Sequence, residues 1–115
     1  MEFTIYHNPR CRKSREALQY LEEKATEYQT VKYLEDLFDK KTLGDVLKKI
    51  KLNPSDIVRK NETLWKKEYA SQYLTENQIL ELLVKYPHLI ERPIIIRSDK
   101  GVLARPLKNL IDFLK

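Results

Sequence analysis

The first 33 residues alternate between the periodicities of a strand, a helix and a second strand, and this order restricts the possible folds. The β-branched and aromatic run Phe3 to Tyr6 predicts a strand, which Asn8-Pro9 ends because proline cannot continue a central ladder. Apolar residues at helical spacing predict an amphipathic helix from about Cys11, and the alternating run Tyr28 to Tyr33 predicts the second strand. A strand-helix-strand unit of this length predicts two parallel strands.

The middle of the chain carries helix signals. Thr42 is expected to cap an amphipathic helix, and a short helix is expected from Asn53 to near Lys60. Thr75 and Gln78 have the spacing of a capping box, which predicts the start of a buried helix that ends before Pro87. Residues from about 40 to 90 are therefore expected to form a helical insert.

The C-terminal segment predicts a hairpin and a last helix. The run Pro93 to Arg97 is rich in isoleucine, a turn follows, and Val102 to Ala104 is expected to pair back with it. Pro106 is expected to open the final helix. The sum is βαβ, a helical insert, and ββα, which is the thioredoxin order. We therefore expect one α/β domain over residues 1–115, with a thioredoxin-like fold and a mixed four-stranded sheet.

Composition excludes several classes of protein. Apolar residues make up 42% and charged residues 34% of the sequence, as in soluble globular proteins, and its apolar runs are too short to span a membrane. The first residues lack the pattern of a signal peptide, so a cytoplasmic location is expected. The formal net charge is +5, but the lysines are spread along predicted helices and no aromatic-basic motif of the RNA-recognition type is present. Direct nucleic-acid binding is therefore disfavoured.

The single cysteine, Cys11, constrains the chemistry. No intramolecular disulfide can form, and Cys11, His7 and His88 lack the spacing of zinc ligands, so we expect no metal site and no bound cofactor. Cys11 lies where a helix begins, and free backbone N–H groups and the helix dipole favour a thiolate there. The alternative is an inert thiol packed in the core.

Several neighbours in the sequence are candidates for tuning this thiol. Four basic residues occur within four positions of Cys11 and are expected to lower its pKa: Arg10, Arg12, Lys13 and Arg15. Ser14 is expected to cap the helix or to donate a hydrogen bond to the thiolate. His7 either has its ring satisfied by the backbone at the strand end or tunes the thiolate electrostatically.

One extended stretch and four shorter ones resemble the glutaredoxin-coupled arsenate reductases of the thioredoxin fold. The extended stretch is Tyr6-His7-Asn8-Pro9-Arg10-Cys11-Arg12-Lys13-Ser14-Arg15. The similarity continues, in order, with Tyr33-Leu34-Glu35, Val58-Arg59-Lys60-Asn61, Leu89-Ile90-Glu91-Arg92-Pro93-Ile94 and Ala104-Arg105-Pro106. The resemblance therefore covers nearly the whole chain.

The resemblance implies a site and a reaction. Cys11 would be the nucleophile that attacks arsenate, Arg59, Arg92 and Arg105 would hold the oxyanion, and Pro93 would be the cis-proline of the fold. Arginine suits this role because its planar donors match a tetrahedral oxyanion and its charge persists at any working pH. Glutathione would be the co-substrate and glutaredoxin the protein partner, because a chain with one thiol must obtain its reducing equivalents from outside.

One departure from the family pattern and two alternative functions leave the assignment open. Arg12 and Lys13 replace the small residues common after the cysteine, which predicts a narrower pocket or a changed anion preference. One alternative is a regulator similar to the Spx-type proteins, which bind RNA polymerase, although Ser14 replaces the second cysteine of their redox switch. The other is a general glutathione-dependent thiol reductase without a role in arsenate reduction.

Overall fold

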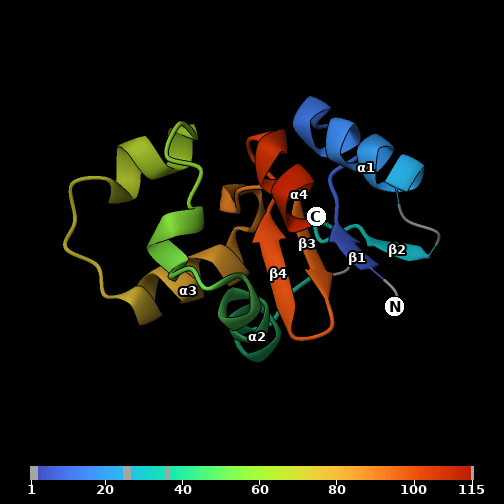
Figure 1. The fold of residues 1–115 in the computed structure, drawn as a ribbon. Helices are drawn as coiled ribbons and strands as arrows, with labels where there is room; N and C mark the ends of the chain where they lie inside the picture. The colour runs from blue at the N-terminus through green and yellow to red at the C-terminus, as the bar shows by residue number, and fades with distance from the viewer. Residues whose placement is uncertain (1–2, 25–26, 36, 115) are drawn as a thin grey trace.

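The computed structural model describes residues 3–24, 27–35 and 37–114, and its centre is a four-stranded sheet with helices on both faces (Figure 1). The strands are β1 (Phe3–Tyr6), β2 (Tyr28–Val31), β3 (Ile94–Arg97) and β4 (Lys100–Leu103). Their order is β2-β1-β3-β4, with β1 and β2 parallel and the other two pairs antiparallel. The predicted mixed sheet and thioredoxin-like α/β fold are confirmed.

Two hydrophobic clusters hold the helices to the sheet. On one face, α1 (Arg12–Lys24) and α4 (Leu107–Phe113) pack with Ile5 and Ile95. The other cluster joins α2 (Lys40–Ile50) and α3 (Glu76–Lys85) to Ile94 and Ile96. Because side chains alternate along a strand, the consecutive isoleucines of β3 serve both clusters. This double burial makes β3 the strand on which both layers depend.

The segment between β2 and β3 is mostly helical and extends away from the sheet (Figure 1). Besides α2 and α3 it contains the short helices η1 (Pro54–Ile57), η2 (Trp65–Tyr69) and η3 (Pro87–Leu89). After η1 the backbone turns extended, and Val58 forms an antiparallel bridge with Ile90. The short helix predicted to reach Lys60 therefore ends at Ile57.

The helix starts show which local signals were decisive. The capping box of Thr75 and Gln78 is present at the start of α3, as predicted. The prediction that Thr42 caps α2 is wrong. Asp39 is the N-cap and accepts a hydrogen bond from the backbone N–H of Thr42, whose side chain bonds back to the N-cap backbone. Thr42 belongs to the same capping box, at its other end.

Candidate active site

Cys11 lies in the tight connection between β1 and α1. Its backbone N–H donates to the carbonyl of Asn8 at 3.0 Å, and its own carbonyl accepts from the N–H of Arg15 at 3.0 Å, the first bond of the helix. The side chain of Asn8 closes the turn by accepting from the N–H of Arg10. The thiol is therefore at the N-terminus of a 13-residue helix, and it is partly exposed. This placement contradicts the alternative of a cysteine sealed in the core.

The surroundings lower the pKa of the Cys11 thiol. Burial alone would raise it, but the backbone N–H of Ser14, a hydrogen bond from Arg92 and the positive charge of Arg92 together outweigh burial, helped by the N–H of Lys13. Each of these groups stabilises the anion, as expected at a helix N-terminus. The positive charge comes from a residue 81 positions away in the sequence, so it depends on the fold.

The basic residues next to Cys11 in the sequence have other partners. Arg12 and Lys13 both form ion pairs with Glu16, at 3.3 Å and 3.9 Å, and their side chains are 83% and 55% exposed. Arg15 donates to the carbonyl of Pro9 on the surface. Lys13 contributes a backbone N–H to the thiolate, and Arg92 provides the side-chain cation. The bulky pair after the cysteine thus lies exposed on α1, paired with Glu16.

His7 and Ser14 form a buried hydrogen-bonded pair behind the thiol. Ser14 Oγ is 2.7 Å from His7 Nδ1 and accepts from the backbone N–H of Asn8 at 3.1 Å. All three residues are buried. The pKa of His7 is lowered by burial and then by the charges of Lys32 and Arg15, so the ring is neutral near pH 7. The serine hydroxyl thus fixes the loop, and only its backbone N–H faces the thiol.

Arg92 reaches Cys11 because β3 lies next to β1. The pairing of Ile94 with Tyr6 sets the residues before β3 beside the loop that leaves β1. Arg92 is 8% exposed, and its peptide bond to Pro93 is cis. Its Nε has no hydrogen-bond partner among the described residues. A buried guanidinium nitrogen without a partner is rare, because such a group costs free energy.

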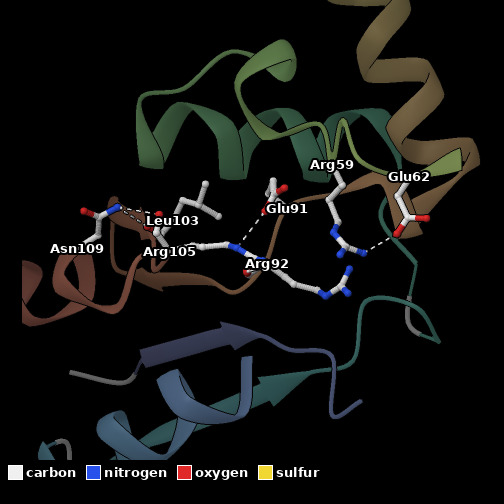
Figure 2. A network of polar contacts seen from close by, with 7 residues as sticks. All are labelled: Arg59, Glu62, Glu91, Arg92, Leu103, Arg105 and Asn109. Atoms are coloured by element: carbon white, nitrogen blue, oxygen red, sulfur yellow. Dashed lines mark hydrogen bonds and ion pairs between the residues drawn. The ribbon is translucent and has the colours of Figure 1, made fainter. Parts of the chain in front are cut away.

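Arg59 reaches the same region from the helical segment. The chain from Ile57 to Arg59 pairs with the chain leading to Arg92: Glu91 N–H donates to the Ile57 carbonyl, and Arg59 N–H donates to the Leu89 carbonyl, both at 2.7 Å. In Figure 2 the guanidinium groups of Arg59 and Arg92 extend into one region. The Arg59 guanidinium is held on one side by an ion pair to Glu62 at 2.6 Å.

Arg105 has a different environment from the other two arginines. Its guanidinium lies 3.5 Å from the Glu91 carboxylate and donates to the Arg92 carbonyl at 3.4 Å (Figure 2). The Arg105–Pro106 peptide bond is also cis, a feature not predicted from the sequence. The structure thus brings Arg92 to the thiol and Arg59 into the region of the Arg92 guanidinium, while Arg105 braces the backbone that carries Arg92.

Tyr33 is a further residue of this site, and no local pattern in the sequence predicts a role for it. Burial raises the pKa of its phenol, and the charges of Arg92, Arg59 and Cys11 also act on it. The only signal in the sequence was its position in the stretch Tyr33-Leu34-Glu35, which matches the resembling family. Alternation had instead predicted that Tyr33 ends the second strand, but β2 ends at Val31 and Tyr33 begins a turn.

The described ranges contain neither a cluster of metal-ligating side chains nor a membrane-spanning helix. Within them, the His, Cys, Asp and Glu side chains form no group of three or more that could hold a metal ion. None of the helices in the same ranges has the length and apolar character needed to cross a membrane.

Comparison with known proteins places this site in a family. The model of the ArsC family matches residues 6–113, which include every site residue described above. The chain belongs to the ArsC family. This ArsC-family protein is 38% identical over 112 residues to YfgD of Escherichia coli, an uncharacterised protein, with 96% of this chain and 94% of that one covered.

Relatives with named activities are similar over comparable lengths. An arsenate reductase of Neisseria meningitidis is 36% identical over 111 residues, covering 95% of each chain. The solved structure of an arsenate reductase from Vibrio cholerae superposes with a TM-score of 0.90 at 32% identity, covering 97% of each chain. The full-length match agrees with the order of motifs seen in the sequence.

Proposed function

We propose that this ArsC-family protein is an oxidoreductase that reduces arsenate to arsenite, with the Cys11 thiolate as nucleophile. The observation that carries the proposal is the pairing of a partly exposed thiol of lowered pKa with the buried guanidinium of Arg92. A thiolate at a helix N-terminus is reactive, and an adjacent cation attracts an anionic substrate. The activity named for the relatives from Neisseria meningitidis and Vibrio cholerae supplies the substrate.

The first step is nucleophilic substitution at arsenic. The Cys11 sulfur forms a bond to arsenic, and one arsenate oxygen leaves as water after protonation, so arsenic stays pentavalent in a covalent thiol-arsenate adduct. Arg92 and Arg59 stabilise the negative charge on the remaining oxygens. Arg105 holds the backbone before Pro93 and joins the oxyanion clamp if its guanidinium leaves Glu91.

The second stage reduces arsenic with thiols from outside the chain. The glutathione sulfur attacks the Cys11 sulfur of the adduct, the S–As bond breaks, and its electron pair leaves with arsenic as arsenite. Cys11 and glutathione are then joined as a mixed disulfide. Glutaredoxin then resolves the mixed disulfide by thiol exchange. Balanced overall, arsenate and two thiols give arsenite, one disulfide and water. The protein needs no bound cofactor for this, and we place the chemistry in the cytoplasm, where thiols are kept reduced.

A groove beside the thiol loop suits the co-substrate. It has a volume of about 170 Å³, and its lining includes Pro9, Arg10, Lys32, Leu34 and the acidic Glu35. Glutathione carries two carboxylates, which the cations of Arg10 and Lys32 would attract, and one ammonium group, which Glu35 would attract. This groove is therefore our proposed approach for glutathione to the Cys11 adduct.

The test is arsenate reduction with glutathione, glutaredoxin, glutathione reductase and NADPH, which is oxidised as disulfide forms. We expect arsenate-dependent NADPH oxidation by the natural protein and none above background by Cys11→Ser. Turnover of a glutathionylated peptide without turnover of arsenate would contradict the proposal in favour of a general thiol reductase. Capture of RNA polymerase by a protein inactive in both assays would favour a regulator.

A further inference from the structure

The phenol of Tyr33 is a buried polar group that the mechanism above does not use. Tyr33 is 1% exposed and belongs to the larger hydrophobic cluster, where its ring lies 6.2 Å from that of Phe38. The ring is therefore fixed by packing. Its hydroxyl is at the other end of the side chain, among the charges of Cys11, Arg92 and Arg59.

The hydroxyl is a hydrogen-bond donor without an acceptor. Burial raises the pKa of Tyr33 despite the opposing effect of Arg92, so the phenol is protonated near neutral pH. Arg92 acts on the phenol oxygen by its charge and as a nearby side-chain donor, and an arginine cannot accept the phenol proton. Neither Tyr33 Oη nor Arg92 Nε has a partner with full hydrogen-bond geometry among the described residues. Buried polar groups without partners are rare because they cost free energy. Two unsatisfied donors in one place indicate a shared acceptor.

We propose that Tyr33 Oη and Arg92 Nε both donate hydrogen bonds to oxygens of the tetrahedral oxyanion that the Cys11 thiolate attacks. This inference rests on the proposed function, and it adds Tyr33 as an oxyanion-binding residue to the cysteine and arginines. The acceptor must be an anion because it lies among guanidinium groups, and it must have several oxygens to accept from donors on different segments.

A neutral donor also makes a contribution that another cation would not. The guanidinium groups of Arg92 and Arg59 already supply positive charge, and a further charge would strengthen binding of every anion alike. A phenol on a packed ring instead requires an acceptor atom at one position. Tyr33 therefore selects for the position of an oxygen, with little effect on the charge that holds Cys11 as a thiolate.

The experiment compares Tyr33→Phe with Tyr73→Phe, which removes the same hydroxyl from a fully exposed side chain. Cys11 is alkylated with iodoacetamide, a neutral reagent, across a range of arsenate concentrations without glutathione. We expect arsenate to protect the thiol in the natural protein and in Tyr73→Phe. In Tyr33→Phe, half-protection should require roughly tenfold more arsenate, as for loss of one hydrogen bond to a charged group. Alkylation without arsenate should be unchanged.

The melting temperature of Tyr33→Phe without arsenate distinguishes a binding role of the hydroxyl from a structural one. Removing an unsatisfied buried hydroxyl should leave the anion-free melting temperature of Tyr33→Phe equal to or above that of the natural protein. A clear decrease would overturn the proposal, because it would show that the hydroxyl has a partner in the folded protein. Unchanged protection in Tyr33→Phe would also overturn it.

The proposed function can fail independently. If arsenate protects Cys11 with the expected dependence on Tyr33 but is never reduced, the oxyanion-binding role of Tyr33 is supported and the proposal of arsenate reductase activity is wrong. If arsenate does not protect the natural protein at all, the assignment of Tyr33 is overturned together with the oxyanion site.

Discussion

The hydroxyl of Ser14 supports the loop that carries Cys11, and its removal should have a large cost. Ser14 is fully buried, and its Oγ satisfies both His7 Nδ1 at 2.7 Å and the Asn8 N–H at 3.1 Å. Ser14→Ala leaves two buried polar groups without a partner, at about 1–3 kcal/mol each. Alanine is the better helix former and offsets about 0.5 kcal/mol. We expect a net loss of about 1.5–5.5 kcal/mol, which lowers the melting temperature by at least roughly 5 °C.

Thermal unfolding followed by circular dichroism, with reductant present to keep the thiols free, measures this loss. The matched control is Ser71→Ala, which makes the same change at an exposed position. A surface change of this kind should stay within about 0.5 kcal/mol of the natural protein. If Ser14→Ala melts within about 2 °C of Ser71→Ala, the two hydrogen bonds do not stabilise the loop and the reasoning is refuted.

Two further predictions concern charge. Arg92→Leu should raise the pKa of the Cys11 thiol because it removes a hydrogen bond and a cation that favour the thiolate. The control is Arg12→Leu, which removes an exposed cation and should leave this pKa unchanged. Ultraviolet titration of the thiolate measures both variants, and equal effects would contradict the assignment of Arg92 as the cation beside the thiol. Burial and nearby cations lower the pKa of His7 below 6.5, so the unfolded chain binds its proton first as the pH falls, and stability is lost below about pH 6.5. Between about pH 7.5 and pH 5.5, the melting temperature of His7→Gln should therefore fall less than that of His88→Gln, which changes an exposed histidine. If the melting temperatures of the two variants fall in parallel, His7 does not cause the loss of stability.

The elements with local signals could be predicted from the sequence. The strand Phe3–Tyr6 and the capping box at Thr75 depend on neighbouring residues alone, and both are present as predicted. The π-helical turn η2 had no such signal, because its formation depends on how the projecting segment packs. The second strand was predicted two residues too long, since alternation does not reveal that Tyr33 turns into the core.

The candidate site could be predicted only where its chemistry is local. The position of Cys11 at a helix start follows from the Asn8-Pro9 break and the helical pattern after it. The cation beside the thiol could not be predicted in this way, because residues adjacent in sequence project in different directions around a helix. Arg12 and Lys13 turn toward Glu16. That Arg92 lies beside the thiol depends on the pairing of β1 with β3, which no local pattern specifies.

This dependence on long-range pairing couples the reactivity of Cys11 to folding. The groups that favour its thiolate come from the start of α1 and from the segment before β3, which only the folded sheet brings together. A cysteine whose pKa is lower in the folded state stabilises that state above the folded pKa. This contribution is complete once the pH exceeds the ordinary pKa of the unfolded thiol, and it is lost as the pH falls through the folded value. The unfolded chain therefore has a thiol of ordinary reactivity, and the part of the activation that Arg92 supplies is confined to molecules in which β3 has joined β1.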